Sequence, residues 1–549
     1  MGISNEPRRV PRRPRAQIAV VDVLEKRLGS LPVIADFSGR LDIAGIIDRA
    51  CPMRDIALVS HGQVIEALIA NRLTHPQAMV AVADWATDWA VEEVYGISSD
   101  VLNDDRLGRA LDAIAPQVDH IVGSIGAKAI DAFGIDVTRL HWDMTSISLY
   151  GAYEQAEEGY ARPKFGHPKD RRPDLKQIQT GIGTSADGGI PVYHRAYDGG
   201  AAEVSQVTGA MTALKDMAAQ RSFLLIGDSK LISYPNVRDI TGAKVAFIAP
   251  APEQHVAASV LAACDLDKAV EVDYTARRDA GKPTDRRGTW RVYEDTMVLS
   301  PPKRTTGPDI TLRRVFVHST ARAAAAQTAR AKKLARASDD LDRLRRGLGS
   351  RHYPDEAAVR NRLAVIGKTR RVAAYLNATA STGTDTGKPA LTWEFNQQAL
   401  QVEAATDGWY ALLANLDPAE ADTPGVLHRF KGQEVSERRY GNYKGPLAVA
   451  PLFLRHNRRI EALITVICLA LLVFCLIERQ IRTQIAPQTK IPGLYAGRPA
   501  RPTGWLIFLA LAGIRLIPAT GDRPAVIPRP TPLQQRLLEL LEVDPLKPP

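Results

Sequence analysis

The chain has 549 residues, of which 45% are hydrophobic and 24% are charged, a composition typical of a soluble globular protein with several domains. Lysine and arginine exceed aspartate and glutamate by 71 − 61 = 10, which indicates a polyanionic partner such as nucleic acid or an anionic membrane surface. The four cysteines are scattered and form no CxxC motif, which argues against a structural zinc site and fits a reducing cytoplasm.

The first 135 residues divide into a basic arm and a helical domain. Residues 1–19 are rich in arginine and proline, so they form either a solvated tail or an arm that contacts phosphate groups. Residues 20–135 are predicted to be mostly helical, with Ser60 and Gln63 placed as a reciprocal helix cap. A further short helix after Pro76 would complete a helix-turn-helix reader of DNA, and ordinary helix packing is the alternative.

An α/β pattern begins at residue 136 and continues to residue 250. The segment HWDMTSISLYG predicts a strand carrying Asp143, and FLLIGD predicts a short buried strand ending in Asp228. A polar, basic loop, two further strands and a tight turn at Tyr197-Asp198-Gly199-Gly200 lie between them, followed by a helix. We expect each aspartate to lie where its strand ends.

The second half of the chain interrupts this pattern and then resumes it. Residues 251–400 are predicted to form an insertion of strands and basic helices, in which the charges of helix 320–348 form either a solvated face or a track along DNA. Residues 401–480 return to the α/β pattern. Residues 481–549, rich in proline and arginine, are predicted to be an extended tail apart from a short helix at Gln534–Val543, which could dock on the body or on a second subunit.

Two apolar runs raise the question of a membrane. Ala462–Ile477 is almost wholly apolar but has only 16 residues, below the roughly 20 that a spanning helix needs. Gly504–Ile514 is shorter still. We therefore predict that the first run is a buried core helix and that the protein has no membrane partner, with a membrane protein as an open alternative.

The segment Val435–Leu447, VSERRYGNYKGPL, precedes the first apolar run and is dense in charge. Glu437 and Lys444 are seven residues apart, which is two helical turns, so they share one helix face with Phe430, Gln433 and Tyr440. A carboxylate and an ammonium on one stripe suit a site that handles metal and phosphate. They equally suit an ordinary surface ion pair.

Three acids stand out across the whole chain, namely Asp143, Asp228 and Glu437. The intervals between them are 85 and 209 residues. Three carboxylates that meet at one edge of a sheet can hold two divalent ions, Mg²⁺ or Mn²⁺, which suit in-line phosphoryl transfer. A carboxylate at a strand end is also a common turn cap, so each acid alone is weak evidence.

Several motifs in order resemble the DDE transposases of bacterial insertion sequences, in the branch whose third acid lies in a tyrosine-arginine-glutamate-lysine helix. The resemblance spans about residues 25–480 and is carried by LHWDMTSISLYG, YHRAYDGGAAE, FLLIGDSKLIS, DGWYALLANL and VSERRYGNYKGPLAVAPLFL. The N-terminal segments LVSHGQVIEALIANRL and LNDDRLGRALDAI are similar to the helical domain that precedes the core in these elements.

The resemblance implies a ribonuclease-H-like α/β core that is interrupted by a β-containing insertion and preceded by a helical, DNA-binding domain. Asp143, Asp228 and Glu437 would be catalytic metal ligands for Mg²⁺ or Mn²⁺. The resemblance further implies a homodimer that acts on double-stranded DNA in the bacterial cytoplasm, at the nucleoid. The expected DNA-binding residues are Lys444, Gln433, Tyr197, Arg195 and Lys230.

Some residues depart from the family pattern. Phe430 and Gln433 stand where the signature has tyrosine and arginine, and Gly441 stands where an arginine is frequent. Phosphate positioning should suffer, because a hydroxyl and two cations are missing. A decayed transposase that only binds DNA is therefore the main alternative. A hydrolase that uses two of the acids as an acid/base pair is a weaker one, since aromatic residues make up only 6% of the chain.

Overall fold

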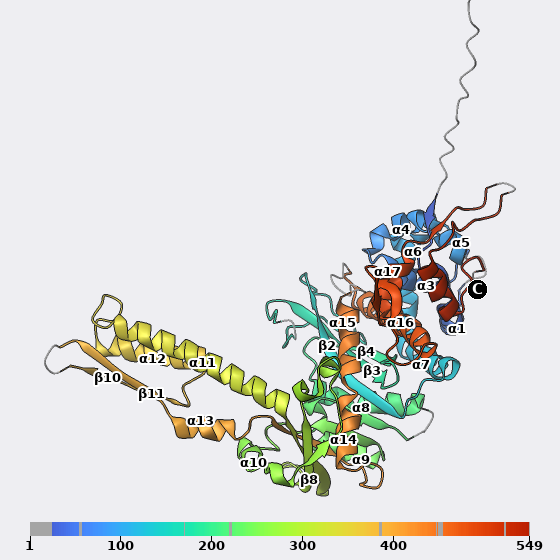
Figure 1. Ribbon diagram of the computed structural model, residues 1–549. Coiled ribbons are helices and arrows are strands. Elements are labelled where there is room, and N and C mark those ends of the chain that lie inside the picture. The colour runs from blue at the N-terminus through green and yellow to red at the C-terminus, as the bar shows by residue number, and fades with distance from the viewer. Residues whose placement is uncertain are drawn as a thin grey trace, which may run out of the picture.

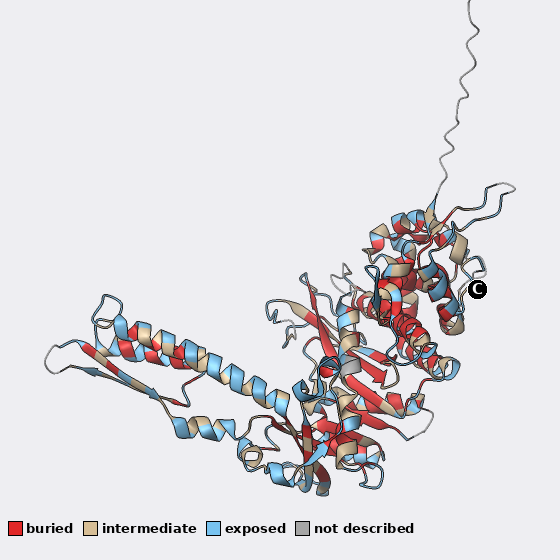
Figure 2. Cartoon of the chain, viewed as in Figure 1, coloured by how far each residue is buried: buried red, intermediate tan, exposed pale blue. Residues whose placement is uncertain are grey.

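The computed structural model describes residues 25–53, 58–168, 171–218, 222–383, 387–445, 447, 454–520 and 523–547, except for the side chains of 434–436. The basic arm at residues 1–19 lies outside this part of the chain. A helical domain and a central sheet form the body, and a long arm projects from the sheet (Figure 1). The interior of the body is buried, whereas the surface of the arm is mostly exposed (Figure 2).

The helical domain packs around α3, which is buried along most of its length. The Ser60 side chain accepts the backbone N–H of Gln63, and the Gln63 side chain accepts that of Ser60, which confirms the predicted helix cap. The exposed residues of α4 include Asp84 and Asp88, which phosphate groups would repel. These two helices therefore fit ordinary packing better than a DNA reader. The domain contains α1 (Leu31–Arg40), α2 (Ile43–Ala50), α3 (His61–Thr74), α4 (Val82–Asp88), α5 (Val91–Tyr95), α6 (Asp104–Ile114) and α7 (Val118–Phe133).

A nine-stranded mixed sheet forms the centre of the body, in the order β4-β3-β2-β5-β6-β12-β9-β8-β7. Strand β3 runs antiparallel to both β2 and β4, β5 and β6 run parallel to β2, and β12 returns antiparallel to β6. The strands are β2 (Arg139–Leu149), β3 (Lys176–Ser185), β4 (Pro191–Tyr197), β5 (Leu224–Ile226), β6 (Ala246–Pro250), β7 (Val270–Val272), β8 (Trp290–Leu299), β9 (Ile310–Ser319) and β12 (Trp409–Ala414).

Helices and single turns of 3-10 helix flank this sheet. They position the loops at the ends of the strands. The helices are α8 (Glu203–Met217), α9 (Tyr234–Gly242), α10 (Ala258–Ala262), α14 (Thr423–Lys431), α15 (Glu434–Lys444) and α16 (Asn457–Thr483). The 3-10 turns, including those of the helical domain, are η1 (Met79–Ala81), η2 (Ser99–Leu102), η3 (Ala115–Gln117), η4 (Ser229–Leu231), η5 (Leu266–Lys268), η6 (Arg277–Asp279) and η7 (Thr284–Arg286).

The insertion has two parts. Strands β7, β8 and β9 extend the central sheet beyond β12, while residues 320–404 form the projecting arm (Figure 1). The arm contains three helices and a hairpin, with small apolar clusters of its own around Leu341 and Val372. It consists of α11 (Thr320–Arg346), α12 (Glu356–Arg370), β10 (Leu376–Thr382), β11 (Pro389–Phe395) and α13 (Gln397–Ala404).

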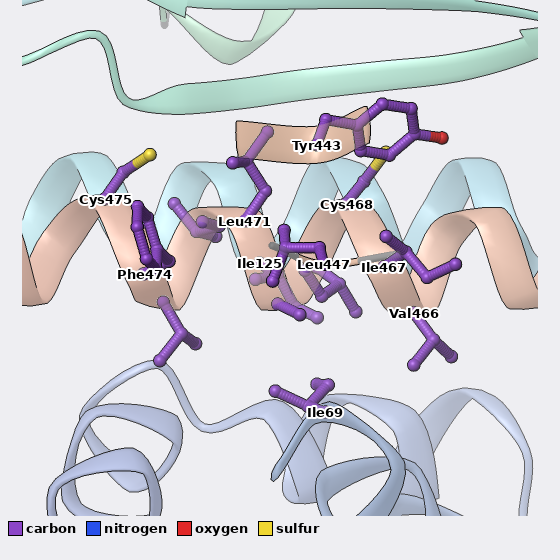
Figure 3. Packing of buried hydrophobic residues seen from close by; sticks show 14 of the residues in the cluster. Ile69, Ile125, Tyr443, Leu447, Val466, Ile467, Cys468, Leu471, Phe474 and Cys475 are labelled. Atoms are coloured by element: carbon purple, nitrogen blue, oxygen red, sulfur yellow. The ribbon is translucent and has the colours of Figure 1, made fainter. Parts of the chain in front are cut away.

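Helix α16 is the spine of the body, and its apolar residues from Ala462 to Ile477 are buried, as predicted for a core helix. Figure 3 shows Tyr443 next to Cys468 on one side of α16, with Val466 and Ile69 on the other. By length and composition α16 could cross a membrane, but 94% of its most apolar window is buried inside the protein. The helix thus joins the helical domain to the sheet within one apolar cluster.

The predicted extended tail is wrong in most of its length, because the C-terminal segment folds back onto the body. Strand β15 pairs antiparallel with β1, with Lys26 opposite Leu516, and the Arg40 side chain donates to the carbonyl of Leu541 (3.4 Å). The predicted terminal helix is present and docks on its own chain. The segment contains β13 (Ile491–Tyr495), β14 (Arg498–Ala500), α17 (Gly504–Leu511), β15 (Arg515–Leu516) and α18 (Pro532–Leu541), and β1 is Lys26–Arg27.

Candidate active site

Asp143 and Asp228 lie close together, just beyond the parallel pairing of β2 with β5. The last residue pair between β2 and β5 is His141 with Ile226, and each aspartate follows two residues later. Asp228 comes just after β5, as predicted, and its Oδ1 accepts the backbone N–H of Lys230 (2.9 Å). Asp143 is not at a strand end: it lies inside β2, because that strand continues as a long hairpin with β3.

The pKa of Asp228 is shifted by its surroundings. Burial raises the pKa of the Asp228 carboxyl, and the charges of Asp143 and Glu203 raise it further. The Lys230 side chain opposes this effect but forms an ion pair with Glu203. A divalent cation bound between two neighbouring carboxylates relieves their mutual repulsion, and carboxylate oxygens are suitable ligands for it.

Helix α15 is fixed across the sheet at the level of Asp143. The hydroxyl of Tyr440 donates to the main-chain carbonyl of Asp143, and the hydroxyl of Tyr443 lies 3.3 Å from that of Thr180. Arg439 is 2% exposed, and its guanidinium donates to the carbonyls of Gly188 and Gly189, the latter at 3.1 Å. These contacts set the helix that carries Glu437 and Lys444 directly over β2 and β3.

Glu437 and Lys444 are both exposed on α15, which ends at Lys444. The predicted single helix from Phe430 to Lys444 is wrong, because the chain breaks between α14 and α15 at Gly432 and Gln433. Despite the break, Phe430, Gln433 and Glu437 line one cavity of about 400 Å³. The other lining residues are Tyr274, Ala276, Arg277, Arg278, Trp290 and Lys431.

This cavity combines aromatic faces with positive charge. The Lys431 ammonium lies 3.8 Å from the centre of the Trp290 ring, and Arg277 and Arg278 complete the basic wall. Glu437 is the one acid among the lining residues. The cavity is thus suited to a planar group that carries negative charge.

The candidate metal ligands are only partly assembled. Among the described residues, no group of three or more histidine, cysteine, aspartate or glutamate side chains is arranged to hold a metal ion. The structure therefore brings Asp143 and Asp228 together but does not place Glu437 with them in such a group. The donor chemistry of the two aspartates fits a divalent ion, and the three-acid site stays a prediction.

The remaining predicted contacts lie in two places. Lys230 is exposed beside Asp228, whereas Tyr197 and Arg195 line a separate cavity of about 680 Å³ that none of the three acids borders. Tyr197 meets the Trp142 ring edge to face, with ring centres 6.5 Å apart. The guanidinium of Arg195 lies 3.4 Å from the Asp119 carboxylate. Tyr197 and Arg195 therefore lie outside the candidate site around Asp143 and Asp228.

Sequence reasoning gave no role to three residues around the site. The charge of Glu203 raises the pKa of Asp228, the Tyr440 hydroxyl donates to the Asp143 carbonyl, and Arg277 lines the cavity with Glu437. Tyr440 had a usable signal, because it shares a helix stripe with Glu437. Nothing in the polar stretch around Arg277 marks that residue.

Part of the chain matches a known protein family, and its structure is similar to that of a known protein. Residues 23–122 match a family model described as "Domain of unknown function (DUF4277)", which covers most of the helical domain. No curated protein matches the sequence. The chain is similar in structure to a piggyBac transposase, solved by cryo-electron microscopy in a synaptic complex with hairpin DNA, at 9% identity and a TM-score of 0.38. The match covers 89% of this chain and 82% of that one.

Proposed function

We propose that the protein is a DDE-type transposase that cuts double-stranded DNA at the terminal inverted repeats of its element and transfers the freed 3′-hydroxyl to target DNA. The observation that carries the proposal is that Asp143 and Asp228 lie close together beyond the parallel pairing of β2 with β5, with helix α15 bonded to the Asp143 carbonyl. An antiparallel meander, β4-β3-β2, joined to parallel β5 and β6, supports a ribonuclease-H-like core.

The residues around the aspartates have distinct tasks in this proposal. Asp143 and Asp228 would hold Mg²⁺ or Mn²⁺, with Glu437 as the third acid. Bound metal would supply an activated water or hydroxyl and stabilise the leaving oxygen. Tyr440 holds β2 and α15 together, so that the acids keep their relative places. Lys444 and Lys230 would contact DNA phosphates.

The wider setting follows from the same proposal. The helical domain would bind the terminal repeats, and a homodimer would hold two DNA ends together. Such a protein would act in the cytoplasm, at the nucleoid. The DNA flanking the coding sequence offers a direct check: inverted repeats with short target duplications beyond them are expected there.

Cleavage assays test the chemistry. Wild-type protein is expected to cut DNA carrying the flanking repeats in Mg²⁺ or Mn²⁺ and not in EDTA. Asp143→Asn and Asp228→Asn should each lower the rate by more than about 100-fold, the upper range for losing a group that merely supports a metal ligand. Asp216→Asn, at an exposed aspartate of α8, is the matched control and should cut like wild type.

A DNA-binding protein without catalysis is the second candidate. It is favoured by one observation, namely that Glu437 does not join the two aspartates in a metal-holding group among the described residues. Wild-type protein that binds the repeats but cuts no better than Asp143→Asn would establish this second function. Cutting that persists in EDTA would instead indicate a metal-free hydrolase.

A further inference from the structure

The loop between β2 and β3 carries two exposed aromatic rings, each with a cation beside it. Tyr150 directly follows β2 and is 61% exposed, and the guanidinium of Arg172 lies 5.8 Å from the centre of its ring. Phe165 is 60% exposed, and the ammonium of Lys176 lies 6.0 Å from the centre of its ring. Lys176 pairs with Leu149, the neighbour of Tyr150, so both rings lie near the start of β3. Exposed aromatic rings that gather on one surface mark a place of interaction.

A cavity of about 420 Å³ opens beside Tyr150. Its lining includes the rings of Tyr150 and Tyr153 together with Leu454 and Arg455. The backbone of Tyr153 is left-handed, with φ at +43°, and a Cβ on Gly151 would lie 2.9 Å from the Tyr153 ring. A non-glycine residue keeps such a conformation only where its surroundings fix it, and such residues cluster at ligand sites. The cavity therefore has one exposed tyrosine and one tyrosine that is fixed in place.

Positive charge surrounds this cavity. Residues 161–176 contain six lysines and arginines and two aspartates, a net charge of 6 − 2 = 4. Within the described part of the chain, Lys176 and Arg455 form no ion pair with a carboxylate. The Lys176 ammonium instead donates to the carbonyls of Ala152 and Tyr153, the latter at 3.1 Å. Two cations next to the aromatic rings are thus available to an anionic ligand.

Aromatic faces and available cations together fit a nucleotide whose base is unpaired. A base in a single strand offers its flat face for stacking, whereas a duplex presents base edges and the backbone. The volume of the cavity is in the range that holds small organic ligands, so one base can enter. Glu154, the one acid among the lining residues, can accept a hydrogen bond from a base amino group. An anionic membrane would instead require a continuous apolar face, which a cavity with a carboxylate does not provide.

We propose that the cavity beside Tyr150 binds an unpaired nucleotide of single-stranded DNA. The base stacks on the Tyr150 ring, and a neighbouring base stacks on Phe165. Lys176 and Arg455 bind the phosphates of the same strand. A strand rises about 3.4 Å per residue, so Tyr150 lies roughly 24 Å along β2 from Asp143, away from the candidate metal ligands. The naming of a strand of the cleaved element as the occupant rests on the proposed function, whereas single-strand binding itself does not.

Fluorescence anisotropy with two labelled strands tests the site without any cleavage. One strand is an oligothymidine, and the other is an abasic strand of the same length, which keeps every phosphate and lacks the bases. Wild-type protein should bind the oligothymidine more tightly. Tyr150→Ala should weaken oligothymidine binding about 5- to 150-fold, the usual value for one stacked base, and leave binding of the abasic strand unchanged. Equal affinity of the wild type for the two strands would overturn the proposal.

Matched variants separate stacking from folding. Tyr150→Phe keeps the ring and should bind like the wild type. Tyr495→Ala, at a 58% exposed tyrosine of β13, should leave both affinities unchanged. Because Tyr150 is exposed, Tyr150→Ala should melt at the temperature of the wild type, so that lost binding does not reflect lost folding. Equal weakening by Tyr150→Ala and Tyr495→Ala would contradict a site at this cavity.

The salt dependence of binding tests the phosphate contact. Arg455→Gln should reduce the slope of log K against log salt by about 0.7 on both strands, the value for one phosphate of a single strand. Arg536→Gln, at an exposed arginine of α18, should leave the slope unchanged. An unchanged slope in Arg455→Gln would refute the phosphate contact.

Two further probes distinguish other ligands. Thymidine monophosphate that competes as strongly as the oligothymidine would refute the assignment to a strand and indicate a site for free nucleotides. Phosphatidylserine vesicles whose binding is lost in Tyr150→Ala, while oligothymidine binding is kept, would overturn the proposal in favour of a membrane contact. Single-strand binding by a wild type that never cuts DNA would keep this site and refute the nuclease. Cutting by the wild type, with normal single-strand binding in Tyr150→Ala, would refute this site alone.

Discussion

At the scale of single residues, Tyr440 is the most informative contact of the candidate site. Its buried hydroxyl joins α15 to the main chain of Asp143. Tyr440→Phe should lower the free energy of unfolding by about 1 kcal/mol, the usual net value of one hydrogen bond. Urea unfolding measures this loss, and Tyr495→Phe, at an exposed position, should show none. An unchanged value for Tyr440→Phe would mean that the bond does not hold the helix.

Glu66 gives the helical domain a predicted dependence on pH. Burial raises the pKa of its carboxyl to about 7, and the nearby Asp48 and Asp42 add to the rise against the hydrogen bond from the Ala44 N–H (3.2 Å). The folded state therefore holds the proton more tightly than the unfolded state. The stability that protonated Glu66 contributes is fully present below pH 4.5, the usual pKa of a glutamate. It is lost as the pH rises through about 7.

Glu66→Gln should abolish this loss. Between pH 5 and pH 8 the wild type should lose on the order of 2–3 kcal/mol more than the variant in urea unfolding. At pH 5 the two proteins should be nearly equal, because the wild-type carboxyl is still protonated there. Parallel stability curves for the two proteins would contradict the prediction.

The sequence predicted the candidate site only in part. Asp228 could be located because a short apolar strand ending in an acid is a strong local pattern, and Asp143 because its strand carries few other charges. Glu203 and Arg277 could not be found, since their importance depends on packing between segments far apart in the chain. The break at Gly432 was missed because helical spacing alone does not show where one helix ends and the next begins.

At the scale of elements, α16 concentrates the stability of the body. Leu471 is fully buried among helices and strands (Figure 3). Leu471→Ala should cost about 2–5 kcal/mol, because it leaves a cavity in this core. Leu509→Ala, at a 57% exposed leucine of α17, should cost far less. Similar losses for both variants in thermal or urea unfolding would argue that α16 is not the core.

The elements themselves show where sequence patterns succeed. The strand with Asp143, the long helix α11 and the apolar helix α16 were all expected from local sequence pattern and composition. The fold of residues 484–547 was not, because its short elements carry many prolines and gain their stability from distant partners. Strand β15 exists because β1 pairs with it, and no local signal reports that contact.

At the scale of the whole molecule, charge is concentrated in the arm. Residues 320–404 contain 15 lysines and arginines and 8 aspartates and glutamates, so 15 − 8 = 7 of the net charge of +10 lies there. Lys332 and Arg336 are exposed one turn apart on α11. The double change Lys332→Gln and Arg336→Gln should weaken non-specific DNA binding and reduce its salt slope by about 1.8.

A variant with the same loss of charge elsewhere is the control for the arm. Arg536→Gln with Lys547→Gln removes two cations from the C-terminal segment and should leave the salt slope unchanged. Equal effects of the two double variants would mean that DNA senses only the total charge. A larger effect in the arm would identify α11 as a track along the DNA backbone.

The pairing of β1 with β15 joins residues 490 positions apart, Lys26 and Leu516. A ribosome adds about 5–20 residues per second, so the helical domain waits roughly 25–100 s for its last strand during synthesis. For most of that interval the helical domain also lacks α16, which begins at Asn457 and packs against α3 and α6. The helical domain is therefore completed only after residue 516 has been synthesised, and a chaperone that shields apolar helices should raise the soluble yield.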